Sequence, residues 1–357
     1  MVNNEIDPKI LVVSDIHLGA FKSELDMFQK FLTDIDTGEF GNDLQALIIL
    51  GDFFDLCTDK PSTLFNNKQI KNILEILNKI KLEKNLMFVL GNHEIPVTGN
   101  YDKKFKHRKT KFLERFKIGI IDDFFKDEMF CQYIILKKFD NEDSILLYDS
   151  IENIFDGFIK KIKINGLELD NNYDCLMTHG YQFDSELFRF SAGMLWSYLI
   201  KSDDMSVKDS FDYLWNIIIK GDQKVKDSEF KVMLDQLPAL KDLEAKISHD
   251  NFSEHNKHKF DFIKLYMRIL EKWEESSKYE YYIDGIRDFL KDKNHNLTDI
   301  NNIIYGHSHK WKSSQENIGN NEINIINDGA WQNVTPTYVE ISSKGRIKII
   351  EIPAFTI

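Results

Sequence analysis

The sequence has very little cysteine. It contains three, Cys57, Cys131 and Cys175, in a chain of 357 residues. Because their number is odd and they are widely spaced, neither a disulfide framework nor a cysteine-ligated zinc site is indicated. We therefore expect reduced, partly buried thiols.

The sequence also lacks a surplus of basic residues. It has 46 Lys and Arg against 58 Asp and Glu, which gives a formal net charge of −12 and a pI of about 5.4. Proteins that track along nucleic acid depend mainly on Lys and Arg that neutralise phosphates. The acidic balance therefore counts against such a protein, although a local basic groove is compatible with it.

Long hydrophobic runs are absent as well. No segment approaches the roughly 20 apolar residues that a membrane-spanning helix needs. The opening residues, MVNNEIDP, do not combine a basic stretch with an apolar one, as a secretory signal does. We therefore expect a cytoplasmic protein without a transmembrane segment. Its 42% apolar content is still enough to bury a large core.

The first 180 residues repeat a pattern of a short apolar run rich in β-branched residues, a polar turn and an amphipathic helical stretch. This alternation predicts an α/β fold. Strands are predicted at 10–14, 46–50, 87–90, 144–148 and 175–178. Strand character returns at 303–305, and an antiparallel finish is predicted from 323–326, 337–341 and 346–350.

The stretch between these two parts has a different character. Residues 185–300 show helical periodicity and many charged residues. We therefore predict a discontinuous core domain of residues 1–184 and 301–357, interrupted by a helical insertion at 185–300 that could act as a lid.

Polar side chains follow five of the predicted strands. The strings are Ser14–His17 (SDIH), Gly51–Asp55 (GDFFD), Gly91–Glu94 (GNHE), Thr178–Gly180 (THG) and Gly306–His309 (GHSH). Ligands and catalytic groups gather at the carboxyl ends of strands in α/β sheets. Alternation along an extended strand end would also place Asp15 beside His17, and His307 beside His309, so that each pair could chelate an ion.

The donors in these strings suit hard to borderline metals, because they are imidazole nitrogens, carboxylate oxygens and an amide oxygen, without a thiolate. One string alone would be weak, since Gly, Asn and Asp are ordinary turn formers. All five together predict a metal site, in which Asp52 is the natural carboxylate to bridge two ions. The predicted ligands are Asp15, His17, Asp52, Asn92, His179, His307 and His309.

This set of motifs resembles the calcineurin-like metallophosphoesterases. The resemblance covers the chain from Ile10 to about His179 and resumes at Ile303. It implies a four-layer αββα sandwich, here with a helical insertion, and a dinuclear site at one sheet edge. It also implies two ligand sets, Asp15, His17, Asp52 and His309 for one ion and Asp52, Asn92, His179 and His307 for the other.

The resemblance further implies a mechanism. Two divalent ions, first of all Mn²⁺ with Fe, Zn, Ni or Mg as alternatives, would activate a hydroxide that attacks the phosphate. His93 would stay off the metals and protonate the leaving oxygen as a general acid. Asp55 completes a Gly-Asp-x-x-Asp pattern and is predicted to orient His93. The alternative for Asp55 is a loop-capping role.

Departures from subfamily patterns narrow the range of possible substrates. Phosphoprotein phosphatases carry Asp-Arg-Gly at the end of the second motif and Arg before Gly-Asn-His. This sequence has Asp55-Leu56-Cys57 and Leu90 at those places. Without these arginines the bidentate phosphate clamps are missing, which disfavours a phosphoserine or phosphothreonine phosphatase.

The layout is similar to that of UDP-2,3-diacylglucosamine pyrophosphohydrolases, which place a helical lid between the His-Gly motif and the final Gly-His-x-His. Asp328–Trp331 followed by Pro336–Tyr338 also resembles their closing segment. The insertion is longer than that lid and does not align with it. Aromatic and aliphatic positions within 187–200 would line an acyl or nucleobase pocket, or form ordinary core.

We therefore expect a hydrolase that acts on a phosphodiester or a pyrophosphate-linked small molecule. A DNA or RNA nuclease is the rival enzyme class, since the double-strand-break repair nucleases share the five motifs. The basic run at 103–111 would meet a substrate phosphate or form a solvated helix face. A non-enzymatic binding module that retains the fold is the remaining alternative.

Overall fold

The computed structural model describes residues 8–20, 23–55, 66–91, 130–148, 158–183, 280–291, 299–332 and 335–353. The chain divides into two compact units, one formed by residues 1–181 and 290–357 and the other by residues 182–289. Most of the predicted insertion lies outside the described residues, so its helical character and its boundaries stay predictions.

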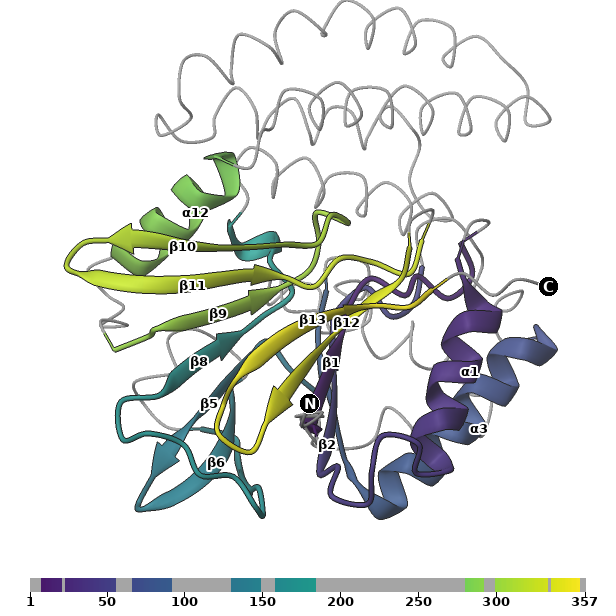
Figure 1. The fold of residues 1–357 in the computed structure, drawn as a ribbon. Helices are drawn as coiled ribbons and strands as arrows, with labels where there is room; N and C mark the ends of the chain where they lie inside the picture. The colour runs from purple at the N-terminus through teal and green to yellow at the C-terminus, as the bar shows by residue number, and fades with distance from the viewer. Residues whose placement is uncertain are drawn as a thin grey trace, which may run out of the picture. The chain divides into compact units, whose positions relative to one another are not determined.

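A six-stranded sheet forms one layer of the larger unit (Figure 1). Its strand order is β13-β12-β1-β2-β3-β4. The strands are β1 (Pro8–Val13), β2 (Ala46–Leu50), β3 (Asn85–Val89), β4 (Phe130–Cys131), β12 (Thr337–Ser342) and β13 (Ile347–Glu351). β1 to β4 are parallel, whereas β12 pairs antiparallel with both β1 and β13.

Helices α1 (Leu25–Asp36) and α3 (Lys68–Glu83) lie side by side on one face of this sheet (Figure 1). Asn67 caps α3, because its side chain accepts a hydrogen bond from the backbone nitrogen of Gln69 at 2.8 Å. The buried positions recur at helical spacing, which gives each helix one apolar stripe. These positions are Phe28, Phe31, Leu32 and Ile35 in α1, and Ile70, Ile73, Leu74, Leu77 and Ile80 in α3.

A seven-stranded sheet forms the second layer, in the order β10-β11-β9-β8-β5-β6-β7. Its strands are β5 (Tyr133–Phe139), β6 (Glu142–Tyr148), β7 (Lys160–Lys163), β8 (Asp174–Met177), β9 (Asn302–Tyr305), β10 (Lys312–Ile318) and β11 (Asn321–Asn327). The described helical segments also include a 3₁₀ turn, η2 (Tyr181–Phe183), and α12 (Glu280–Lys291).

The predicted antiparallel finish is wrong in one strand. β11 pairs antiparallel with β10 but parallel with β9, and it belongs to the seven-stranded sheet, not to the sheet that contains β12 and β13. β12 and β13 do pair antiparallel, but in the other sheet. The chain therefore crosses from one sheet to the other after β11, and this crossing segment, 328–331, passes the site described below.

The core consists of two apolar layers on opposite faces of the six-stranded sheet. Within β1, Leu11 and Val13 belong to the cluster packed against α1 and α3. Ile10 and Val12 belong to the cluster shared with the seven-stranded sheet. Because β1 is buried on both faces, its sequence is a continuous apolar run. The expected mixed α/β sandwich with two sheets is thus confirmed.

Two further expectations concern the cysteines and the membrane. Cys131 and Cys175 are buried free thiols, and burial raises the pKa of each well above its usual range. Cys57 lies outside the described residues. In the part of the chain that the structure describes, no helix is long and apolar enough to cross a membrane.

The aromatic rings packed between α1 and the six-stranded sheet lead to a prediction about stability. Trp331 is fully buried, with its ring centroid 5.0 Å from that of Phe28 and 5.2 Å from that of Phe31. Trp331→Ala should lower the free energy of unfolding by about 3–5 kcal/mol, since it opens a large cavity. Urea denaturation followed by circular dichroism measures this loss.

Leu82→Ala is the control, because Leu82 is 87% exposed and a surface substitution of this kind changes stability by about 0.5 kcal/mol or less. Equal effects of the two substitutions would contradict the packing described for Trp331.

Candidate metal centre

The loops after β1 and β2 run side by side and carry the first predicted ligands. The backbone nitrogen of Asp15 donates to the carbonyl of Gly51 at 3.1 Å, and that of His17 donates to the carbonyl of Asp52 at 2.8 Å. These bonds continue the parallel pairing of the strands beyond their ends. Asp15, His17 and Asp52 are therefore held on one backbone ladder.

The predicted ligands have unusual backbone angles. The φ angles are 51° at Asp15, 50° at His17, 47° at Asp52, 69° at His307 and 57° at His309. This left-handed region is uncommon for residues with a side chain and is strained by on the order of 1–3 kcal/mol. Such strain persists where the surrounding structure imposes it, as the ladder between the two loops does here.

The expectation of extended strand ends is therefore wrong. β1 ends at Val13, before the left-handed residues begin. Asp15 and His17 do come together, but through a curled loop and not through strand alternation. His307 and His309 do not form a chelating pair, because each joins a different group of side chains.

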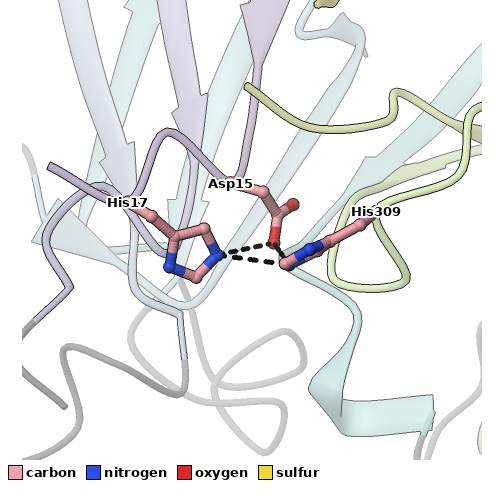
Figure 2. Close-up of side chains that lie close together, drawn as sticks. All are labelled: Asp15, His17 and His309. Carbon is pink, nitrogen blue, oxygen red and sulfur yellow. Dashed lines mark hydrogen bonds and ion pairs between the residues drawn. The ribbon is translucent and has the colours of Figure 1, made fainter. Parts of the chain in front are cut away.

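The first group contains Asp15, His17 and His309 (Figure 2). Nε2 of His309 lies 3.2 Å from Oδ1 of Asp15 and 3.2 Å from Nε2 of His17. Nε2 of His17 lies 3.7 Å from the same Asp15 oxygen. The three side chains, from the loops after β1 and β9, thus converge on one point.

The second group contains Asp52, His179 and His307. Nε2 of His179 lies 3.3 Å from Oδ2 of Asp52 and 3.2 Å from Nδ1 of His307. Nδ1 of His179 lies 2.7 Å from the backbone carbonyl of Leu50, to which it donates its proton. This bond assigns a proton to Nδ1 and directs Nε2 into the group, as in many metal-binding histidines.

Asp52 connects the two groups. Its Oδ2 atom lies 3.3 Å from Nε2 of His179 and 3.7 Å from Nε2 of His17. The carboxylate is almost completely buried, with 1% of the residue exposed. A histidine of each group is therefore within ion-pair distance of one carboxylate oxygen.

The electrostatics of the site favour positive charge. Burial acts to raise the pKa of Asp15, but His179, His17 and His309 outweigh it and hold that pKa well below its usual range. Burial acts to lower the pKa of His179, but Asp52 and Asp15 outweigh it and raise that pKa to about 10. The field of the two carboxylates therefore stabilises a cation at this place.

The donor atoms of the site are of the kinds that bind metal ions. In each group the candidate ligand atoms lie within 4.8 Å of one another. Oδ1 of Asp15 is buried and accepts no well-directed hydrogen bond among the described residues, so its nearest neighbours are the imidazole nitrogens. An unsatisfied buried carboxylate oxygen is costly. Imidazole and carboxylate donors together suit divalent cations of hard to borderline character.

Three predicted site residues remain. Asn92 and His93 lie outside the described residues, so their roles stay predictions. Asp55 is 3% exposed, and its backbone nitrogen donates to the carbonyl of Leu18 at 2.9 Å, which ties it to the loop that carries His17. Whether Asp55 orients His93 stays a prediction as well.

The sequence analysis missed a buried contact behind Asp15. Oγ of Ser14 lies 2.5 Å from Oδ2 of Asp15 and 2.6 Å from Oδ1 of Asp328. A hydroxyl has one proton to donate, so one of the two carboxyl groups must itself be protonated. Burial raises the pKa of Asp328 well above its usual range. This indicates that Asp328 donates to Ser14, which donates to Asp15.

Asn327 gives a second unforeseen support. Its Nδ2 atom donates to the carbonyl of Gly306 at 2.8 Å and to Oγ of Ser308 at 2.9 Å, inside the loop that carries His307 and His309. The backbone nitrogen of Trp331 donates to the carbonyl of Asp15 at 3.0 Å. The polar pair Asn327-Asp328 at the end of β11 is the sequence signal that could have pointed to these contacts.

Comparison with protein families gives the class of protein. The family described as calcineurin-like phosphoesterase matches residues 8–311. The chain therefore belongs to the calcineurin-like phosphoesterase family. It is a metal-dependent phosphoesterase, a hydrolase of phosphate esters, as predicted.

Comparison with individual proteins adds no closer relative. No curated protein matches the chain. Among solved structures, a dimetal phosphatase from Danio rerio is 10% identical, with 96% of this chain and 99% of that chain covered and a TM-score of 0.36. The sulfate thiohydrolase SoxB from Thermus thermophilus, solved with glycerol, is 11% identical, with 96% and 56% covered and a TM-score of 0.32.

The contact behind Asp15 leads to a prediction about metal affinity. Ser14→Ala removes the hydroxyl that connects the two buried carboxyl groups. Oδ2 of Asp15 then loses one of its two orienting hydrogen bonds and keeps the one from the backbone nitrogen of His307 at 2.7 Å. Loss of such a supporting partner weakens metal binding by about 10- to 100-fold. Titration calorimetry with Mn²⁺ on chelator-treated protein measures the change.

Ser144→Ala is the matched control, because Ser144 is also fully buried but bonds to the carbonyl of Glu142, away from the site. Unchanged Mn²⁺ affinity in Ser14→Ala would show that Asp15 does not depend on this hydroxyl.

Proposed function

We propose that this phosphoesterase binds two divalent ions, first of all Mn²⁺, and hydrolyses a phosphodiester or pyrophosphate bond in a small molecule. The observation that carries the proposal is the pair of three-residue groups connected by the buried carboxylate of Asp52. A carboxylate placed between the two groups is suited to bridge the two ions of such a site. A binding module without turnover would not need to retain it together with four converging histidines.

The proposed ligand sets combine the two groups with Asn92, which the family resemblance implies. Asp15, His17 and His309 would hold one ion, while His179, His307 and Asn92 would hold the other, and Asp52 would serve both. When bound, the ions supply Lewis-acid polarisation of the phosphate and a lower pKa for water at the site. The protein supplies fixed directions for its ligands, through the backbone ladder below Asp15 and His17 and the carbonyl of Leu50 below His179.

His93 is proposed as the general acid. It directly follows the proposed ligand Asn92, so its imidazole would be near the departing oxygen without coordinating an ion. The buried Asp55 is proposed to orient this imidazole and keep the proton available.

For the substrate, we propose a pyrophosphate-linked or diester small molecule like those of the UDP-2,3-diacylglucosamine pyrophosphohydrolase-like group. Two observations support this group. The second compact unit, residues 182–289, falls in sequence between His179 and His307, where that group has its lid. The closing segment 328–331 contacts the Asp15 loop through Ser14 and Trp331. The net charge of −12 makes a nuclease the weaker candidate.

We also propose a cytoplasmic location. The free thiols of Cys131 and Cys175 are compatible with it, because the cytoplasm keeps thiols reduced.

The test of this function begins with the ions. Chelator-treated protein should not hydrolyse bis-p-nitrophenyl phosphate, and Mn²⁺ should restore hydrolysis. Parallel assays with p-nitrophenyl phosphate, UDP-sugars and single-stranded DNA rank the substrate classes. Activity that survives thorough chelation, or a clear preference for DNA, would refute the proposal.

Asp52→Ala should be the most damaging ligand substitution, because one side chain is proposed to serve both ions. We expect Mn²⁺ content, measured by plasma mass spectrometry, to fall from two per chain to less than one. Asp34→Ala is the control, since Asp34 lies in α1 and pairs with Lys30. Two fully occupied sites in Asp52→Ala would contradict the bridging assignment.

His93→Asn should separate rate from metal content. We expect both ions to stay bound, while hydrolysis of an alkyl phosphate ester slows by about 10²- to 10⁴-fold, the usual contribution of a positioned acid. The loss should be much smaller for p-nitrophenyl esters, whose leaving group departs without protonation. Loss of metal, or equal slowing of both esters, would assign His93 a different role.

A further inference from the structure

A second group of residues lines a concave site between the two sheets of the larger unit. β10 and β13, which contribute to it, are outer strands of their sheets (Figure 1). Its volume is about 900 Å³, within the range of about 300–1,000 Å³ common for small-molecule sites. None of the predicted metal ligands is among the described residues that line it. We call this feature the β10–β13 groove.

The wall formed by the seven-stranded sheet is polar where a sandwich interior is expected to be apolar. Ile304 in β9 and Ile326 in β11 face the other sheet as part of the inner core. Two residues earlier in each strand, and so on the same face, stand Asn302 and Asn324, which pair with each other across the strands. Gln315 in β10 lies opposite Asn324 and continues this wall.

The amides of this wall are connected in series. Nδ2 of Asn324 donates to Oδ1 of Asn302 at 2.9 Å, and Nδ2 of Asn302 donates to Oδ1 of Asn301 at 2.6 Å. Nδ2 of Asn301 donates in turn to the carbonyl of Asn172. Each amide therefore has a fixed direction. A surface of oriented amides binds a ligand with little loss of side-chain entropy.

An exposed indole and an apolar floor complete the groove. Trp311 lines it with 49% of its surface exposed, which is unusual for the largest apolar side chain. Ile326, Ile347 and Ile349 lie along the floor. The groove thus combines a flat apolar face with amides that both donate and accept hydrogen bonds.

The ring of Tyr173 lies close to the turn between β12 and β13, and this close packing depends on Gly345. A Cβ atom at this position would lie 2.6 Å from Cε2 of Tyr173, and the φ angle of Gly345 is 71°. Glycine is therefore required for the turn to lie against the tyrosine ring. The end of the groove is in this way defined by the backbone and not only by mobile side chains.

The charges around the groove are balanced. Asp170 and Glu322 line it together with Arg346 and Lys348. A phosphate or nucleic acid would require an excess of positive charge in the groove. A cation would require an excess of negative charge. This balance favours a neutral ligand.

We propose that the β10–β13 groove binds a neutral sugar, at a site separate from the metal centre. Sugar hydroxyls donate and accept hydrogen bonds as amides do, and the C–H faces of a sugar ring stack on an indole. The volume accommodates a short oligosaccharide. This binding does not require metal ions or hydrolysis, so it can hold even if the proposed substrate class is wrong.

The test uses the full chain and three neutral trisaccharides, maltotriose, cellotriose and triacetylchitotriose, each titrated by ligand-observed NMR with and without chelator. We expect at least one to bind in both conditions. Trp311→Ala should weaken that binding by about tenfold or more, as truncation of an aromatic anchor does. Asn324→Ala should weaken it too, whereas Trp311→Phe, which keeps an aromatic face, should retain most of it.

Leu82→Ala is the control, because it removes an exposed apolar side chain from α3, outside the groove. Four outcomes would overturn the proposal. The first is no binding of any trisaccharide at millimolar concentration, and the second is binding that is insensitive to Trp311→Ala and Asn324→Ala. The third is a dimer in analytical ultracentrifugation that Trp311→Ala converts to monomer, which would make the groove a contact between two copies. Tighter binding of adenosine than of every trisaccharide would also exclude a sugar site.

Discussion

Two carboxylates buried close together are the constraint on which the rest of the site depends. Asp15 is completely buried and Asp52 is 1% exposed. Both have lost most of their hydration and they repel each other, so their negative charge must be compensated nearby. The histidines from the loops after β1, β8 and β9 provide part of this compensation, which explains the opposite pKa shifts of Asp15 and His179. Divalent ions would provide the rest.

The backbone around these carboxylates is built for close approach. A Cβ atom at Gly51 would lie 2.6 Å from Cγ of His179 and 2.7 Å from the Cα atom of Gly91, and one at Gly306 would collide with the side chains of Ser14 and Asp15. These glycines let loops from both sheets meet. The left-handed residues Asp15 and His17 are held by the hydrogen bonds of the loop ladder, so conformational strain and close packing occur in the same loops.

The sequence was sufficient to predict most of the strands that contain a continuous apolar run, because such a run indicates burial on both faces. β1, β2, β3, β8 and β9 lie within two residues of the predicted ranges at each end. β7 and β10 were missed because they are the outer strands of their sheet and carry mostly polar residues, as in Lys312–Ile318. β5 was missed although it starts with an apolar run, and the short β4 was missed as well.

The side chains that come together at the candidate site were also predictable in part. Motif order predicted that Asp15, His17, Asp52, His179, His307 and His309 lie together. The structure brings them into two neighbouring groups, at the ends of β1 and β2 in one sheet and of β8 and β9 in the other. Local pattern could not reveal the left-handed backbone, nor the contact of Ser14 with Asp328, because these residues are 314 positions apart. Only the tertiary fold, with β11 ending beside β9, brings the second buried acid behind Asp15.

The position of β1 has a consequence for how the protein is made. β1 lies between β2 and β12, and β12 is translated long after it. Until residues 337–342 have left the ribosome, one side of β1 lacks its hydrogen-bonding partner, and Trp331 does not yet cover Phe28. The nascent chain therefore exposes an apolar strand for most of its synthesis, a state in which chaperones protect chains from aggregation. The loops that carry the candidate ligands can come together only after His307 and His309 have been translated, so the candidate metal site is complete only late in the synthesis of the chain.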